Sequence, residues 1–262
     1  MVRTLSVASL FLAGLALTTA AARQEPAPLQ DPEPLAPELA QQFADQGIRI
    51  DRGAGTIRID GTICQRYEPL EYLLVKQPQG KDHEALLAIE DLSPTALNAA
   101  MLMMGVVPGE NGRIIPTDPE PTLEEVQAGV APYTFEPAYG DGFYMYVSWE
   151  REIAGEMQQF RYRAEDLVLN VREESTYRRA KFVYLGSRFI KPHKDAKEFF
   201  AAEGQGNLVS LVNFRPADHL LAGADTAADN QSIWYPNVFL LPPVGHPVEI
   251  WFTRDLLEPG VQ

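Results

Sequence analysis

The sequence predicts an α+β fold with a mostly antiparallel sheet, one buried helix at about residues 93–104 and long surface loops. Short runs of alternating apolar residues predict strands along much of the chain, and one segment carries a full set of helix signals. Strands and helices do not alternate regularly, which argues against a parallel, doubly wound sheet. Of the 262 residues, 45% are hydrophobic, enough for the core of one large domain or two small ones.

The clearest strand signal lies at residues 48–64, IRIDRGAGTIRIDGTIC, where isoleucines alternate with polar residues on both sides of a glycine-containing turn. This pattern predicts a β-hairpin. A second hairpin is predicted from the alternating segments 142–149 and 156–163. Further strands are predicted at residues 70–77, 83–90, 181–186, 207–214 and 247–253.

The predicted buried helix has the sequence SPTALNAAMLMMG. Ser93 is a suitable N-cap, Pro94 suits the first helical position, and Gly105 suits the C-terminal cap. The body of the helix is apolar on nearly every side, so we expect burial over most of its surface. A shorter helix is predicted at residues 38–47.

The N-terminus has the layout of a secretory signal peptide at residues 1–22, with Arg3 before an apolar run and small residues near Ala22. Cleavage after Ala22 would leave a proline-rich tether at 23–40 and a domain at 41–256, either undivided or in two subdomains. The predicted location is therefore the periplasm or the extracellular space. An uncleaved segment would instead anchor the chain, so a membrane is predicted as a partner only in that case.

Two segments have an unusual composition. Residues 106–141 are rich in proline and acidic residues with little periodicity, which predicts a long surface excursion that could cover a ligand or contact a partner. Residues 161–197 hold ten Lys or Arg against five Asp or Glu in a chain whose net charge is −14. This basic segment predicts docking of an anionic polymer or envelope partner; the alternative is a solvated face paired with acidic residues of the same chain. The overall acidity argues against nucleic-acid binding.

Cys64 is the only cysteine, which excludes an intramolecular disulfide, a thiolate zinc cluster and an iron–sulfur cluster. The stretch KDHEALL, residues 81–87, is similar to the start of the zinc-protease helix motif, but Leu87 stands where that motif has its second histidine. No metal and no cofactor is therefore predicted. Cys64 is either a buried, inert thiol or a nucleophile paired with His83, with Glu84 orienting the ring.

Four segments carry a resemblance. They are GTICQRYEPLEYLLVKQPQGKDHEALLAIED at 61–91, FVYLGSRF at 182–189, NLVSLVNF at 207–214 and VFLLPPVGHPVEIWF at 238–252. In this order they resemble the YdjY-domain proteins, which are exported bacterial proteins, over about residues 48–253. The sequence departs from the family pattern at Glu68, Ala85 and His246, which stand where the family has glycine, serine and threonine.

The resemblance implies a domain type and an exported location but no activity, because the family has no established reaction. It also implies which positions a shared site would use. The matching positions are, for binding, Lys81, Glu71 and Asn213 and, for catalysis, Cys64, His83 and Glu84. The sequence therefore predicts a non-enzymatic binding or envelope-associated module. The alternative is a hydrolase-like or metal-dependent enzyme that uses His83 and Glu84, with or without Cys64.

Overall fold

The structure is a computed structural model that describes residues 35–191 and 193–258. All of these belong to one compact unit, Pro32–Gln262. The predicted signal peptide, 1–22, and residues 23–34 of the predicted tether lie outside the described residues. Among the described residues, no helix has the length and apolar character needed to cross a membrane.

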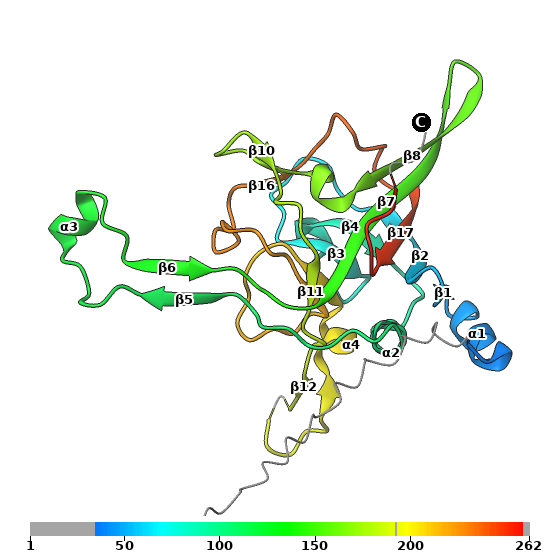
Figure 1. The fold of residues 1–262 in the computed structure, drawn as a ribbon, viewed down its shortest axis with the longest axis horizontal. Coiled ribbons are helices and arrows are strands. Elements are labelled where there is room, and N and C mark those ends of the chain that lie inside the picture. The colour runs from blue at the N-terminus through cyan, green and yellow to red at the C-terminus, as the bar shows by residue number, and fades with distance from the viewer. Residues whose placement is uncertain (1–34, 192, 259–262) are drawn as a thin grey trace, which may run out of the picture. The chain divides into compact units, whose positions relative to one another are not determined.

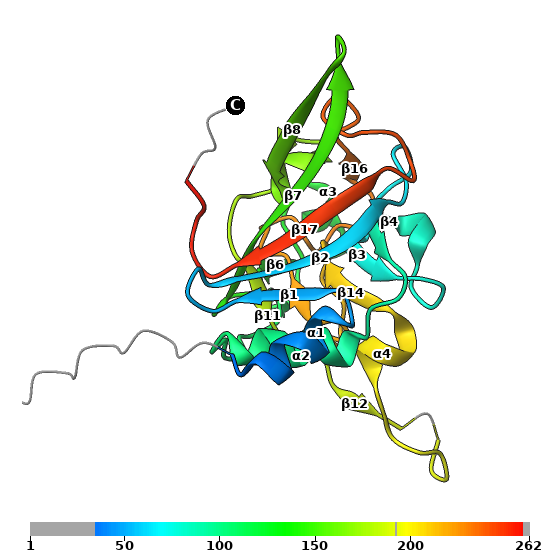
Figure 2. The same cartoon turned by 90° about the vertical axis from the view of Figure 1, so that its right-hand side faces the viewer.

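The predicted α+β class is wrong, because the structure is mostly β and is built around a closed barrel. Eight strands form a ring in the order β2–β17–β7–β11–β15–β14–β3–β4, and β4 pairs back with β2. The ring strands are β2 (Thr56–Ile63), β3 (Tyr72–Lys76), β4 (Ala85–Ile89), β7 (Gly142–Ile153), β11 (Phe182–Tyr184), β14 (Asn207–Ser210), β15 (Leu221–Ala222) and β17 (Pro247–Thr253). Strand β1 (Ile48–Asp51) pairs with β2, and β8 (Glu156–Arg163) pairs with β7. Figure 2 shows β1, β2, β17 and β7 side by side.

Closure of the barrel depends on β2, which has two neighbours along one of its edges. Its first half pairs with β1, while Thr62 and Ile63 pair with Ala88 and Leu87 of β4. A ring has no free edge strand, so closure satisfies backbone groups that an open sheet would leave exposed. Most pairs are antiparallel, but β3 with β4 and β14 with β15 are parallel.

Local predictions were more accurate than the fold class. Both predicted hairpins are confirmed, as β1–β2 and β7–β8. The short helix is confirmed as α1 (Pro37–Ala44), and strands form in each of the other predicted segments. The remaining elements are α4 (Ala201–Gln205), β9 (Val168–Asn170), β10 (Ser175–Thr176), β12 (Phe189–Ile190), β13 (Phe199–Phe200), β16 (Trp234–Pro236) and the single 3₁₀ turns Asp82–Glu84 and Ala164–Leu167.

The predicted helix at 93–104 is confirmed as α2 (Pro94–Met103), and the Ser93 hydroxyl accepts a hydrogen bond from the Ala96 N–H at 3.3 Å. Its expected burial on most sides is wrong. Leu97 and Met101 are buried, whereas Leu102 is 49% exposed. Figure 2 shows α2 near α1 and α4 below the barrel strands, so the helix buries one face against the barrel and leaves the other to solvent.

The core fills the barrel with the inward side chains of alternating strand positions. On β7 these are Phe143, Met145, Val147 and Trp149, each at most 4% exposed. Burial of each such side chain stabilises the fold by about 1.5–3 kcal/mol. Tyr146, on the outward side of β7, is also buried, and its hydroxyl accepts a hydrogen bond from the Leu257 N–H at 3.0 Å.

The segment predicted as a surface excursion contains a two-stranded ribbon. Strand β5 (Arg113–Pro116) pairs with β6 (Tyr133–Glu136), and α3 (Leu123–Gln127) lies between them in the chain. Figure 1 shows this ribbon projecting from the barrel with α3 at its tip. We call residues 113–136 the arm.

Candidate functional site

The stretch KDHEALL forms the entry to β4. Asp82, His83 and Glu84 make a single 3₁₀ turn, and the strand begins at Ala85. Strands β3 and β4 run parallel with Tyr72 opposite Ala85, which places the residues just before them side by side. Accordingly, the backbone N–H of Glu71 donates to the carbonyl oxygen of Glu84 at 2.9 Å.

Lys81 joins the two carboxylates at this entry. Its Nζ donates to Glu71 Oε2 at 3.0 Å and to Glu84 Oε2 at 2.8 Å. The ammonium also lies 5.8 Å from the centre of the Tyr72 ring and 5.9 Å from that of Phe214, and these rings stack 5.0 Å apart. We call these five residues the Lys81 cluster. Within this cluster, Lys81 already binds both carboxylates and lies near both aromatic rings.

The two carboxyl groups of the cluster differ in proton affinity. Burial and a hydrogen bond with Glu84 raise the pKa of Glu71, although Lys81 acts in the opposite direction. Burial also opposes ionisation of Glu84, but hydrogen bonds from Lys81 and Glu71 outweigh it and lower the pKa of Glu84. When the pair holds one proton, that proton therefore resides mainly on Glu71, and the pair is best described as one coupled unit.

Cys64 lies at the edge of the same region, packed against the buried group that contains Tyr72. Its thiol donates a hydrogen bond to the carbonyl oxygen of Asp82 at 3.0 Å. Burial, together with the negative charge of Asp82, raises the pKa of the Cys64 thiol to about 11. The thiol is therefore protonated at neutral pH, and a thiol in this form is a poor nucleophile.

His83 is largely in solvent, with its side chain 72% exposed. Its Nδ1 is 3.8 Å from Asp82 Oδ1, and its Nε2 is 3.8 Å from Glu84 Oε1. Both distances are too long for hydrogen bonds. In this structure the ring is thus oriented by neither carboxylate.

Asn213 does not join the Lys81 cluster through its side chain. Its Oδ1 is buried without a hydrogen-bond partner among the described residues and lies beside Gly112, at the base of the arm. The structure therefore brings Glu71, Lys81 and Glu84 into one hydrogen-bonded unit with Cys64 nearby, and it places Asn213 elsewhere. Within the described ranges, no group of three His, Cys, Asp or Glu side chains is arranged to hold a metal ion.

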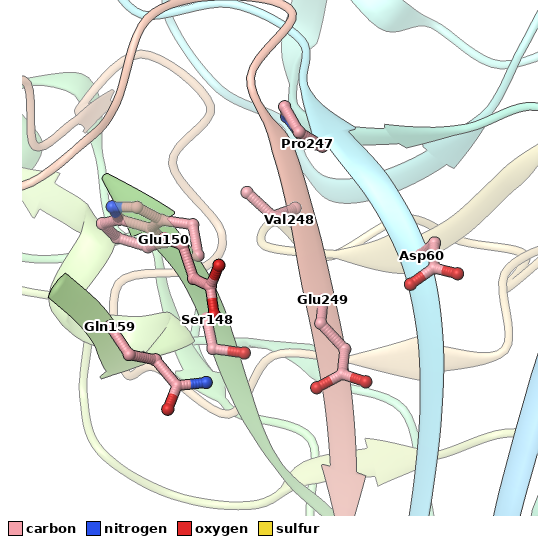
Figure 3. A pocket seen from close by; sticks show the side chains of 8 residues that line it. Asp60, Ser148, Glu150, Gln159, Pro247, Val248 and Glu249 are labelled. Atoms are coloured by element: carbon pink, nitrogen blue, oxygen red, sulfur yellow. The ribbon is translucent and has the colours of Figure 1, made fainter. Parts of the chain in front are cut away.

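A second polar feature lies on the outer face of the barrel, and the sequence did not indicate it. It is an open groove of about 300 Å³ across β2, β17, β7 and β8. We call it the outer groove; its lining residues are Asp60, Ser148, Trp149, Glu150, Gln159, Pro247, Val248 and Glu249. Of these, Ser148, Trp149 and Val248 are buried. Figure 3 shows Asp60 and Glu249 on adjacent strands and Ser148 and Gln159 on the strands beside them.

One end of the outer groove borders an indole ring. The Trp251 Nε1 donates to the Ser148 hydroxyl at 2.9 Å. The guanidinium groups of Arg58 and Arg161 lie over the indole, 5.0 and 5.7 Å from its centre, in cation–π geometry. The groove thus combines hydroxyl, amide and carboxylate groups with two cations at one edge.

A further cation, Arg49, forms ion pairs with one carboxylate on β2 and one on β17. The Arg49 guanidinium bridges Asp60 Oδ1 at 2.6 Å and Glu249 Oε1 at 3.1 Å. These are partly exposed ion pairs, which contribute little to stability. Arg49 thereby engages both oxygens of Asp60, with Nη1 donating to Oδ2 at 2.8 Å, and one oxygen of Glu249.

Sequence reasoning missed the groove because its members come from four strands. The alternating pattern does indicate that these polar side chains point outward, but it does not reveal which strands are neighbours. It also does not show which of the three tryptophans are buried. Trp149 and Trp234 are core residues, whereas Trp251 is partly exposed.

Much of the basic segment 161–197 is neutralised within the chain. Five of its ten cations form ion pairs with acidic residues. These pairs are Arg163–Glu165, Arg172–Glu173, Arg179–Asp166, Lys181–Asp141 and Arg188–Asp218. Arg161, by contrast, lies at the edge of the outer groove.

The fold and these two polar features define a closed β-barrel domain that carries its candidate sites outside the barrel. The chain belongs to the YdjY family, because the family model of the YdjY domain matches residues 48–253. The resemblance seen in the sequence is thereby confirmed. The comparison with solved structures found no match.

Proposed function

We propose that the protein is an exported, non-enzymatic binding module that holds an acidic polysaccharide of the cell envelope in the outer groove. The observation that carries this proposal is the chemistry of the groove. Gln159 and Glu150 are exposed and offer an amide and a carboxylate, and Glu249 is partly exposed beside them. Sugar hydroxyls both donate and accept hydrogen bonds, so they match such a mixed set.

The cations at the groove edge supply the preference for an acidic polymer. Arg58 and Arg161 lie over Trp251, and a guanidinium binds a carboxylate or sulfate with two parallel hydrogen bonds. The basic segment contributes to this edge through Arg161. Among its other cations, Arg179 and Arg188 form ion pairs with acidic residues of the same chain.

Calorimetry with polygalacturonate as the acidic polymer and dextran as the neutral one tests the proposal. We expect polygalacturonate to bind, and we expect Arg161→Gln and Gln159→Ala each to weaken binding about tenfold, because each removes a hydrogen-bonding partner. Arg172→Gln is the matched control, since it removes an exposed arginine of the same segment away from the groove lining.

Two outcomes would overturn the proposal: no binding of either polymer, or equal binding by the wild type and both groove variants. Equal affinity for dextran would remove the preference for acidic groups. The exported location is tested separately, by locating the native chain in cell fractions; a cytoplasmic chain would contradict it.

The second candidate function is a hydrolase-like enzyme at the Lys81 cluster. It is favoured by one observation, the opposite pKa shifts of Glu71 and Glu84, because paired carboxyl groups with diverging pKa values can act as acid and base. Its test is turnover of a panel of esters, amides and glycosides by the wild type and by Glu84→Gln. Turnover that is lost in a folded Glu84→Gln variant would establish the enzyme and contradict the binding module. A rise in melting temperature on adding zinc would support the metal-dependent form.

A further inference from the structure

The arm projects from the rest of the molecule. It consists of β5 and β6 with α3 at the tip, and Figure 1 shows it extending away from the barrel. At its base, the Asn111 amide donates to the carbonyl oxygen of Phe214 at 2.8 Å. At the end of the ribbon nearer the tip, the Tyr133 hydroxyl donates to Asp229 Oδ2 at 2.9 Å. A two-stranded ribbon is only marginally stable in water, so further contacts would stabilise it.

The ribbon has one apolar face. Residues directly opposite each other in a pair of strands share a face. Ile114 pairs with Phe135 and Pro116 with Tyr133, and all four are on the same side. Ile114 is 47% exposed, and Leu123 of α3 at the tip is 74% exposed. Apolar surface on a projecting element is typical of an interaction site.

The arm is also strongly acidic. It contains Arg113 as its single cation against five carboxylates, so its net charge is −4. The five carboxylates are Asp118, Glu120, Glu124, Glu125 and Glu136. A partner of the arm must therefore combine apolar contact with positive charge.

The same chain presents such a surface on another projection. Strands β12 and β13 form a short hairpin on which Phe189 is 65% exposed. Lys191, Lys194 and Lys197 are exposed on the connection between these strands and form no ion pair within the described part of the chain. The same connection carries Asp195 and Glu198, so the net charge of residues 191–198 is +1. We call Phe189 and the three lysines the basic hairpin.

The arm and the basic hairpin of one molecule do not meet. Figure 1 shows the arm and β12 leaving the barrel in different directions. A second copy of the chain can present its basic hairpin to the arm. In a two-fold symmetric pair the contact occurs twice, because each protomer supplies one arm and one hairpin.

We propose that two copies of this chain form a two-fold dimer in which the acidic, apolar arm of each protomer docks on the basic hairpin of its partner. The size of the arm is sufficient: residues 113–136 are 24 residues, within the roughly 20–30 per side of a standard protein interface. The charges of the two surfaces are complementary, and their aliphatic and aromatic side chains supply the contact that excludes water.

Sedimentation equilibrium of the purified protein tests the dimer. We expect a monomer–dimer equilibrium with a Kd on the order of micromolar or tighter, which weakens as salt is raised. Glu120→Lys with Glu124→Lys on the arm should weaken the dimer about tenfold or more, and so should Lys194→Glu with Lys197→Glu on the basic hairpin.

The decisive sample is the mixture of the two reversed variants. Each variant alone places like charges at both contacts, whereas in the mixed dimer one of the two contacts regains opposite charges and the other has both charges reversed, so affinity should return toward that of the wild type. Glu152→Lys with Glu156→Lys at the exposed tip of β7–β8 is the matched control and should leave the dimer unchanged.

Ile114→Asn tests the apolar face separately. The side chain is exposed, so the variant should remain folded by circular dichroism while the dimer weakens. A wild-type protein that stays monomeric at about 100 μM would overturn the proposal. A dimer that survives both charge reversals would overturn it equally, because that dimer would use another surface.

Discussion

The Lys81 cluster and the outer groove are both polar, both outside the barrel, and both built on its strands, but they differ in how far their polar groups are satisfied. In the Lys81 cluster one ammonium binds two carboxylates and lies over two rings. In the outer groove Glu150 and Gln159 are exposed, and their side chains form no hydrogen bond or ion pair within the described part of the chain. A group already engaged by its own chain is poorly available to a ligand, so the positions singled out by family resemblance are not automatically the binding site.

In both regions strand pairing places two carboxylates side by side. Parallel pairing of β3 and β4 places Glu71 beside Glu84, and two adjacent carboxylates are unfavourable unless a cation or a proton separates them. Lys81 is that cation. In the outer groove, antiparallel pairing likewise places Asp60 opposite Glu249, and Arg49 bridges them. These ion pairs are partly exposed, so water screens the charges. Four measurements would sharpen or break this comparison.

The largest effect is expected at His219, which is buried against the edge of the Phe214 ring of the Lys81 cluster. Burial lowers the pKa of His219 to about 4. The unfolded chain binds a proton near pH 6.5 and the folded chain does not, so stability is lost as pH falls from about 6.5 toward 4. The full loss is about 3 kcal/mol.

Urea unfolding at several pH values measures this loss. His219→Leu should make the free energy of unfolding nearly independent of pH in this window, whatever its effect on stability at pH 7. His246→Leu at the outer groove is the matched control and should leave the slope in place. If His219→Leu keeps the wild-type slope, His219 is not the group responsible.

The next effect concerns Cys64. Because the pKa of its thiol is raised to about 11, the native protein holds little thiolate at pH 8. We expect iodoacetamide to alkylate the native protein about 100-fold more slowly than the urea-unfolded protein. Mass spectrometry of timed samples measures both rates. Equal rates would restore Cys64 as a candidate nucleophile and weaken the view that this region is structural.

Removal of the cation from the Lys81 cluster should have an intermediate effect. Lys81→Met leaves Glu71 and Glu84 adjacent without a positive charge, and we expect the free energy of unfolding to fall by about 1–2 kcal/mol, less than for a fully buried pair because Lys81 is partly exposed. The double variant Lys81→Met with Glu71→Gln should recover part of the loss, since only one carboxylate remains. A double variant less stable than the single one would contradict this account.

The smallest effect is expected in the outer groove. Asp60→Asn removes the partly exposed ion pair with Arg49 and should cost less than about 1 kcal/mol of stability. Denaturant unfolding at pH 7 gives the value. A larger loss of stability would show that ion pairs stabilise the groove as they do the Lys81 cluster. The contrast between the two regions would then disappear.

Features that depend on residues close in the chain were predictable from the sequence. The β1–β2 hairpin follows from isoleucines alternating around a short turn, and α2 begins where Ser93 caps it. The exposure of Leu102 was not predictable, because an all-apolar helix does not reveal how many of its sides meet other elements. Of the six positions that the resemblance selected, the structure joins Glu71, Lys81 and Glu84 by ion pairs, whereas Asn213 Oδ1 lies beside Gly112 at the base of the arm.

The sequence by itself determined the hairpins, the capped helix and the family, because each depends on local pattern or on ordered motifs. Only the tertiary structure decided that the sheet closes, through Thr62 opposite Ala88, and that Arg161 meets Trp251 at the outer groove. Such pairings join residues tens of positions apart, and they are selected by the packing of the whole barrel. The alternating pattern of a strand shows which side chains face outward, but only strand order and register determine which of them meet.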